Sequence, residues 1–153
     1  MANTARHVGI VVKEITKTTD FWKNLIGFKL HVDAVEQSPY IDELLGIENP
    51  GLRTVKLIDE NGFIIELLEF SNYPAEGTWQ GNLATTGLTH IALTVNNLNT
   101  LAVKLVENGY KLNSKIKTSP NGLVNVVFVK GPEGLLLELV EELSGPSSDH
   151  EIK

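Results

Sequence analysis

The stretch GFIIELLE at residues 62–69 decides the fold, because it recurs at residues 134–141 as GLLLELVE. Two further pairs of matching stretches precede it in the same order along the chain: RHVGIVV (6–12) with THIALTV (89–95), and NLIGFKL (24–30) with VENGYKL (106–112). Three matches in one order are typical of a chain that contains two copies of one supersecondary unit. We therefore interpret the sequence as a tandem repeat.

Each copy begins with a strand that is followed by a helix. Apolar residues alternate along residues 8–12, which is the two-residue period of a strand. In the second copy, apolar residues recur at helical spacing over residues 98–106, and Gly109 is well placed to end that helix. The corresponding stripe in the first copy is shorter, covering residues 21–26 and ending at Gly27. The first copy also contains an extra segment, in which Ser38 and Pro39 predict the start of a short capped helix, SPYIDELLGI.

Each copy ends in a hairpin of two strands. In the first copy, TVKLI and FIIELLE flank Asn61 and Gly62, a strong signal for a tight turn. In the second copy, VNVVFV and LLLELVE flank residues 130–134. The repeated unit is therefore a βαβββ module, and the expected fold class is α+β.

The modules are expected to form one domain over residues 1–143, with module one at about 4–70 and module two at about 87–142. The loop between them is placed around residues 71–87. The polar residues 144–153 predict a disordered tail, and His150 within it is interpreted as a bystander.

Composition narrows the classes of function. A net charge of −6 argues against nucleic-acid binding, which needs a basic surface. The chain has no cysteine, so a metal here must be held by histidine and carboxylate. We see neither a signal peptide nor an apolar run long enough to cross a membrane, so a cytoplasmic protein that acts on a small molecule is expected.

Glu66 and Glu138 each lie among aliphatic residues in a predicted strand. Both faces of these strands are apolar in sequence, which suggests that the strands are covered on both sides. A buried, ionised carboxylate costs several kcal/mol or more unless another group compensates it. A bound cation is one such group.

His7 and His90 occupy matching positions in the two modules, each sharing a strand face with a small residue, Gly9 or Ala92. The repeat pairs one histidine with one glutamate in each module. Two imidazoles and two carboxylates suit Zn, Ni, Co, Mn or Fe(II). The sequence therefore predicts a site for one divalent metal ion, made by His7, Glu66, His90 and Glu138.

Other interpretations of these residues stay open. IIELLEF could form an amphipathic helix, each histidine could be structural, and each glutamate could pair with a lysine or arginine of a neighbouring strand. Glu69 and Glu141 have the opposite strand parity and are expected at the surface.

The four positions resemble the vicinal oxygen chelate superfamily, which includes glyoxalase I, bleomycin resistance proteins and methylmalonyl-CoA epimerase. The matching motifs are RHVGIVV, IIELLE, THIALTV and LLELVE. The resemblance implies a cup formed by a curved, eight-stranded mixed sheet, with one metal ligand from the first strand and one from the last strand of each module. It also implies a homodimer. The carboxylate Glu66 favours the lyase and isomerase branch over the Fe(II) dioxygenases.

The resemblance implies that the metal stabilises an enediolate, with Glu138 and Glu66 as candidate catalytic bases. The extra helix is proposed to supply Tyr40 or Ile41 to substrate selection, and Arg53 or His31 could reach a polar substrate group; an ordinary surface role is the alternative for each. Two other functions stay open: a metal-free protein that sequesters a ligand, as bleomycin resistance proteins do, and an Fe(II) dioxygenase.

Overall fold

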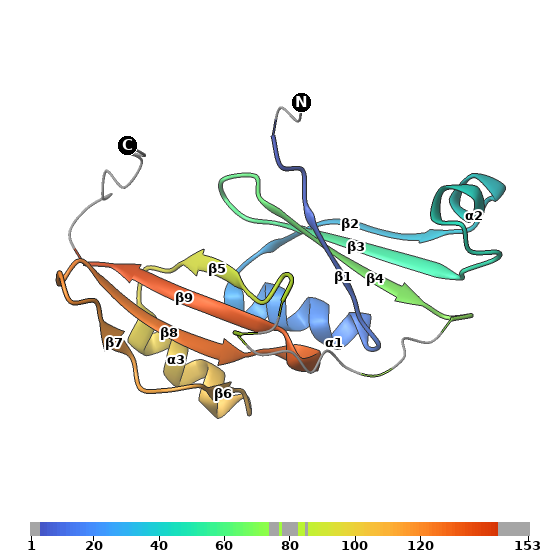
Figure 1. Cartoon of the computed structure of the whole chain (residues 1–153). Helices are drawn as coiled ribbons and strands as arrows, with labels where there is room; N and C mark the ends of the chain where they lie inside the picture. Colours follow the sequence, from blue (N-terminus) through green and yellow to red (C-terminus); the bar gives the residue numbers. More distant parts are fainter. Residues whose placement is uncertain (1–3, 74–76, 78–82, 85, 144–153) are drawn as a thin grey trace. The chain divides into compact units, whose positions relative to one another are not determined.

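Figure 1 shows the computed structural model of the chain, which describes residues 4–73, 77, 83–84 and 86–143. The chain divides into two compact units, Met1–Thr78 and Trp79–Lys153. The division falls within the connection predicted between the two modules. The expected disordered tail, including His150, lies outside the described residues.

The first unit contains one four-stranded sheet with strand order β1-β4-β3-β2. Its elements are β1 (Val8–Val11), α1 (Ile15–Asp20), the π-helix η1 (Phe21–Ile26), β2 (Lys29–Glu36), α2 (Pro39–Leu45), β3 (Leu52–Ile58) and β4 (Ile64–Phe70). β1 pairs with β4 in parallel, whereas the β2–β3 and β3–β4 pairs are antiparallel. The first and last strands of the module are therefore neighbours.

The second unit repeats this topology in a five-stranded sheet with the order β5-β9-β8-β6, in which β7 also pairs with β8. Its elements are β5 (Ile91–Thr94), α3 (Leu98–Glu107), β6 (Lys111–Leu112), β7 (Lys117–Thr118), β8 (Val124–Lys130), the 3-10 turn η2 (Pro132–Gly134) and β9 (Leu136–Glu142). β5 pairs with β9 in parallel. Two βαβββ modules in an α+β fold are therefore confirmed.

The described strands differ from the expected eight in one place, where β6 and β7 together replace a single strand. Leu112 lies opposite Val129 and Lys117 lies opposite Val126, so residues 113–116 face only residues 127–128. The surplus residues leave the ladder and divide the strand, as in a β-bulge.

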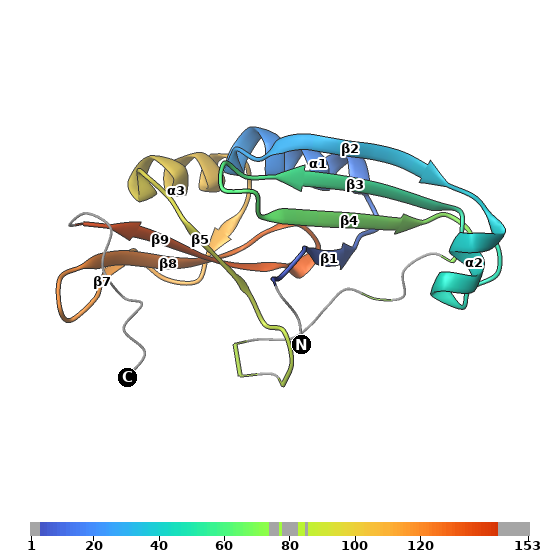
Figure 2. The ribbon, with the colours of Figure 1, turned by 90° about the horizontal axis from the view of Figure 1, so that it is seen from above.

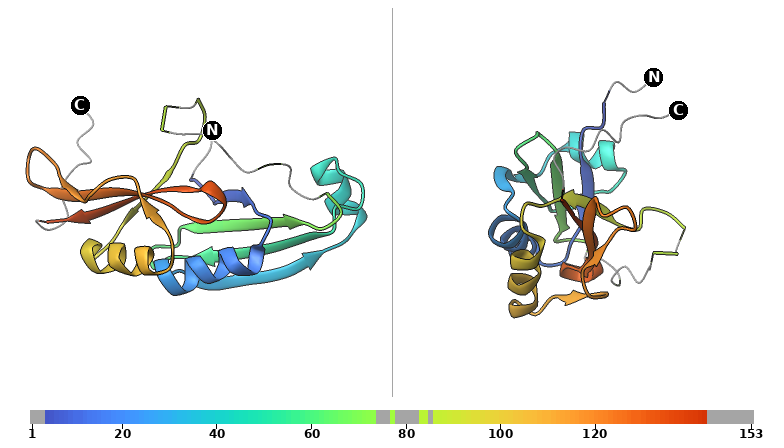
Figure 3. Two further views of the ribbon diagram at one scale, coloured as in Figure 1. Left: turned by 90° about the horizontal axis from the view of Figure 1, so that it is seen from below. Right: turned by 90° about the vertical axis from the view of Figure 1, so that its left-hand side faces the viewer.

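One helix lies against one face of each sheet. Figure 2 shows α1 along the first sheet, and Figure 3 shows α3 along the second. In the first unit Trp22 is completely buried, with edge-to-face ring contacts to Phe21 and Phe28 at centroid distances of 5.9 and 5.0 Å. In the second unit Leu98 and Leu105 of α3 are also completely buried. These side chains form the core on the helical side of each sheet.

The first helical segment is longer than expected, because α1 precedes the predicted stripe at residues 21–26. The stripe itself is η1, and Gly27 ends it with a φ of 102°, a conformation that glycine adopts without steric cost. The extra helix α2 is confirmed: Ser38 Oγ accepts a hydrogen bond from the N–H of Ile41 at 3.3 Å, and Pro39 occupies the first turn.

Glu69 and Glu141 are not simple surface residues, which corrects the sequence-based expectation. Glu69 Oε1 accepts a hydrogen bond from the backbone N–H of Ile15 at 2.9 Å, and Glu141 Oε1 accepts one from Leu98 at 3.1 Å. The first N–H groups of a helix have no partner within the helix. In each module, the last strand therefore caps the helix that follows the first strand.

The helices in the described part of the chain are short. None of them has the length and apolar character needed to cross a membrane.

Candidate functional site

His7 and Glu66 meet in the first unit. His7 Nε2 lies 3.0 Å from Glu66 Oε2, and their side chains are 31% and 14% exposed. The parallel register sets this contact, because Gly9 lies directly opposite Glu66 and His7 lies two residues before Gly9. A methyl group on Gly9 would lie 3.9 Å from Glu66 Oε2, an ordinary contact distance. The strand therefore has room for a small residue beside the pair.

His90 and Glu138 meet in the same way in the second unit. His90 Nε2 lies 3.2 Å from Glu138 Oε2, and the side chains are 33% and 27% exposed. Ala92 lies opposite Glu138, as Gly9 lies opposite Glu66. The other ring nitrogen, Nδ1, lies 2.9 Å from Thr89 Oγ1, and this hydrogen bond orients the imidazole.

The two strands that carry the glutamates each have one fully buried face. On β4, Ile65 and Leu67 are completely buried, whereas Glu66 is on the opposite, half-buried face. On β9, Leu137 and Leu139 are completely buried and Glu138 on the opposite face is half-buried, although Leu136 on that face is buried as well. The expectation that both faces of these strands are fully covered is therefore too strong. The strand assignment itself is confirmed, which excludes the amphipathic helix.

Lys56 is a functional candidate that the sequence analysis missed. It lies opposite Glu66 in the β3–β4 register, and its Nζ is 3.2 Å from Glu66 Oε1. Both oxygens of Glu66 therefore have a partner: His7 for Oε2 and Lys56 for Oε1. The alternative that Glu66 pairs with a basic residue of a neighbouring strand is thus confirmed for this glutamate.

The corresponding position in the second unit is apolar. Phe128 lies opposite Glu138 in the β8–β9 register, and its ring makes an edge-to-face contact with His90 at 5.2 Å. Within the described residues, the only ion pair formed by Glu138 is with His90. The two pairs therefore have the same strand register and differ in the residue opposite the glutamate, which is Lys56 in the first unit and Phe128 in the second.

The donor atoms fit a divalent metal. In each module an imidazole nitrogen and a carboxylate oxygen converge on a half-exposed sheet face, and such N and O ligands suit first-row divalent metals. Each pair supplies two ligands. Within the described ranges, no cluster of three or more His, Cys, Asp or Glu side chains is close enough to hold a metal. One pair alone therefore supplies only half of the predicted set of four ligands, and the four-ligand site stays a prediction.

Arg53 is engaged by a neighbouring acid. Its Nε and Nη2 donate to the two carboxylate oxygens of Asp33 at 3.0 and 2.9 Å, and Nη1 donates to Thr16 Oγ1 at 3.3 Å. The hydrogen bonds from Arg53 hold the pKa of Asp33 below its usual value, and those to Asp33 raise the pKa of Arg53. Arg53 thus has a structural partner, and its contact with a substrate stays a prediction.

The remaining substrate candidates are spread over the first unit. His31 is exposed on β2, at the point where the β2–β3 register shifts. Tyr40 on α2 is 68% exposed, whereas Ile41 is only 7% exposed and packs inward. Tyr40 is therefore better placed than Ile41 to contact a ligand, and the role of each in substrate selection stays a prediction.

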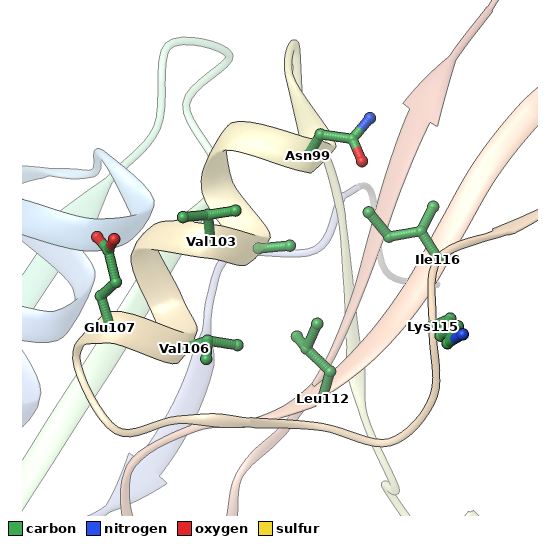
Figure 4. Close-up of a pocket in the computed structure, with 8 residues that line it drawn as sticks. Asn99, Val103, Val106, Glu107, Leu112, Lys115 and Ile116 are labelled. Carbon is green, nitrogen blue, oxygen red and sulfur yellow. The ribbon is translucent and has the colours of Figure 1, made fainter.

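Among the described residues, two of the grooves lie away from the candidate ligands. One, of about 400 Å³, lies between α3 and the segment around β6; Figure 4 shows Val103, Val106, Leu112 and Ile116 lining it. The other, of about 360 Å³, lies at the start of α1 beside Glu69. Neither groove is lined by His7, Glu66, His90 or Glu138.

The repeated module agrees with the comparison to known families. The family model described as Glyoxalase/Bleomycin resistance protein/Dioxygenase superfamily matches residues 4–139. The chain belongs to this superfamily. It is 28% identical over 144 residues to the Bacillus subtilis protein YwbC, covering 92% of this chain and 99% of YwbC.

Solved structures of this superfamily share the fold. A glyoxalase family protein from Bacillus cereus matches with a TM-score of 0.86 and 20% identity, covering 94% of this chain and 97% of that chain. Glyoxalase I from Leishmania major matches with a TM-score of 0.65 and 17% identity, covering 92% of this chain and 88% of that chain. The superfamily fold is therefore shown, and enzymes such as glyoxalase I are among its members.

Proposed function

We propose that this member of the superfamily is a divalent-metal-dependent lyase or isomerase of the glyoxalase or epimerase type, acting on a small oxygenated substrate. The observation that carries the proposal is the repeated pair, one imidazole beside one carboxylate at the same register position of both modules. We propose His7, Glu66, His90 and Glu138 as the ligands of one Zn, Ni, Co or Mn ion. The dimer that is common among relatives is part of the same proposal.

When bound, the ion supplies a Lewis acid that stabilises the negative charge of an enediolate. The residues of the chain supply the rest. His7 and His90 provide neutral nitrogen donors. With Nε2 of His90 as the ligand atom, its Nδ1–H donates to Thr89 Oγ1, and this hydrogen bond keeps the ring oriented. The half-buried faces limit the access of water, which strengthens electrostatic interactions at the site.

Glu138 is the better candidate for the catalytic base. Both oxygens of Glu66 have a partner, whereas within the described residues Glu138 pairs only with His90. In the proposed step the carboxylate of Glu138 takes the proton of a C–H bond next to a carbonyl. The electron pair of that bond forms a carbon–carbon double bond, and the carbonyl pair moves to its oxygen. Delivery of a proton to the opposite face of the same carbon completes an epimerisation. Delivery of the proton to the former carbonyl carbon, while the hydroxyl of the neighbouring carbon passes its proton to the charged oxygen and becomes the new carbonyl, completes an isomerisation.

Metal content and proton exchange test the proposal together. Protein purified without added metal is expected to contain, or to bind, close to one equivalent of Zn, Ni, Co or Mn per chain. In D₂O, metal-loaded protein is expected to exchange the α-proton of at least one compound in a panel of α-hydroxycarbonyl compounds and α-substituted thioesters, followed by proton NMR. A chain that binds no divalent metal contradicts the proposal.

Lys56 is the observation that favours two other functions. Because it compensates Glu66 without a metal, the same residues could belong to a metal-free protein that sequesters a ligand. Because it engages Glu66, it could also leave His7, His90 and Glu138 as a two-histidine, one-carboxylate set, which is typical of Fe(II) oxygenases. Absence of metal supports the first alternative, and native iron supports the second.

A further inference from the structure

We infer that Lys56 makes the two His–Glu pairs unequal, so that His90 and Glu138 dominate metal binding and Glu66 contributes as a weakened ligand. The inference rests on the proposed metal site and concerns how much each His–Glu pair contributes to the affinity for the metal. Lys56 is a positioning residue in this scheme, because it acts through Glu66.

Because the two strand registers match, the residue opposite the glutamate can be compared directly between the modules. Lys56 lies opposite Glu66, and Phe128 lies opposite Glu138, each in the antiparallel pair formed by the last two long strands of its module. Directly opposite residues on one face have neighbouring side chains. The comparison is therefore between an ammonium group and an aromatic ring at one position beside the same carboxylate.

The ammonium group of Lys56 affects metal binding at Glu66 in two ways: it repels a second cation, and it occupies one of the two carboxylate oxygens. Its Nζ is 3.2 Å from Oε1, and the Lys56 side chain is 30% exposed, so water screens the pair only in part. A divalent ion at Glu66 must share the carboxylate with this cation and is repelled by it. Glu138 has no such competitor among the described residues, because Phe128 carries no charge.

The stabilising role of Lys56 is clearest without metal. A half-buried carboxylate needs a compensating charge, and Lys56 provides one permanently to Glu66. Glu138 is 27% exposed and pairs only with His90 in the described structure, so it gains more from an added cation. The same lysine that stabilises the metal-free protein is therefore expected to lower its affinity for the metal.

Removing the charge of Lys56 tests the inference directly. In metal-depleted, full-length protein, Lys56→Met is expected to bind Zn²⁺ about tenfold more tightly than the wild type, since one unfavourable charge near the ligand is lost. Zn²⁺ affinity is measured by competition with a chromophoric chelator. The matched control is Lys29→Met, which removes the same charge from an exposed position of β2 and is expected to leave the affinity unchanged.

Two glutamate variants provide an independent measurement. Glu138→Gln is expected to weaken Zn²⁺ binding at least tenfold more than Glu66→Gln does. The reason is that Glu66 is already shared with Lys56. In Lys56→Met the difference between the two glutamate substitutions is expected to shrink. A thermal melt of every metal-free variant verifies that it is folded before its affinity is interpreted.

The outcomes separate this inference from the proposed function. Equal Zn²⁺ affinity in the wild type and Lys56→Met overturns the inference and leaves the metal site intact. Weaker binding by Lys56→Met overturns it as well. A wild-type chain that binds neither Zn²⁺ nor another divalent metal overturns the proposed function, and the inference with it.

Discussion

The carboxylate of Glu69 accepts a hydrogen bond at 2.9 Å from the backbone N–H of Ile15, 54 residues away in the chain. The second module repeats this bond between Glu141 and Leu98. In both modules a strand that carries a candidate ligand also caps a helix. The two functions alternate along the strand, because the capping residue is three positions after Glu66 or Glu138 and therefore faces the other side.

Removal of either cap is expected to destabilise the protein. Glu69→Ala and Glu141→Ala should each lower the free energy of unfolding by about 1 kcal/mol, the usual cost of losing a helix cap. Glu142→Ala, at the exposed end of the same strand β9, is the control and should have little effect. Urea denaturation followed by circular dichroism measures the change. If Glu69→Ala and Glu141→Ala had the same free energy of unfolding as the wild type and the control, the caps would contribute nothing to stability.

The Arg53–Asp33 pair predicts a specific pH dependence. Because hydrogen bonds from Arg53 lower the pKa of Asp33 in the folded protein, the pair stabilises the fold above about pH 4, the ordinary aspartate value. This stabilisation is lost as the pH falls through the lower, folded pKa. Arg53→Met is expected to cost about 0.5 kcal/mol at pH 7, because exposed pairs are screened by water.

Thermal melts of the wild type and Arg53→Met from pH 7 to pH 2.5 check this expectation. The difference in Tm should be constant near neutral pH and should shrink at the acidic end. A difference that grows on acidification would contradict the assignment of the pair.

Substitution of Glu138 is expected to separate catalysis from folding. Glu138→Gln should reduce turnover by about 10²–10⁴-fold, the usual contribution of a general base, while the circular dichroism spectrum stays native. Glu66→Gln should reduce turnover less, since both oxygens of Glu66 are already engaged. Each rate is measured at saturating metal, so that a weakened affinity does not imitate a loss of catalysis. Normal activity of Glu138→Gln would rule out this residue as the base.

Metal removal is expected to lower stability. A ligand present at a hundred times its Kd stabilises the folded state by about 2.7 kcal/mol, provided that it does not bind the unfolded chain. Chelation should therefore lower the Tm, and added Zn²⁺ should restore it. In His90→Ala the restoration should be largely lost. A Tm that changes neither with chelator nor with added metal would support the metal-free alternative.

Substitution by alanine is expected to have opposite effects on stability at two glycines. Gly9→Ala should be tolerated, because a methyl group there makes only ordinary contacts and Ala92 occupies the matching position. Gly51→Ala should cost about 1–3 kcal/mol, because Gly51 has a φ of 60° and a methyl group would collide with Ser71 Oγ. Both costs are measured by urea denaturation.

The repeat allowed much of the fold to be predicted, because its motifs fix the order of elements in both modules. Residues 15–20 were missed as a helix, since ITKTTD has β-branched and polar residues with low helix propensity. The distant cap from Glu69 helps to hold this turn, and a local reading of sequence does not include such a contact. The division of one strand into β6 and β7 was missed for a similar reason, because a bulge depends on register with β8.

The candidate site was predictable in part. The pairing of His7 with Glu66 and of His90 with Glu138 follows from the repeat, and both contacts are confirmed. Lys56 could have been found by counting outward from the turn at Asn61, which places it opposite Glu66. The engagement of Arg53 by Asp33 was harder to foresee, because it depends on the register of β2, which shifts at His31.

The parallel pairing of β1 with β4 and of β5 with β9 has a consequence for how the chain can be divided. Every ladder between the described strands is completed by residues of a single unit. Two separately expressed halves, or a chain with its halves in reversed order, would therefore retain every strand that these ladders use.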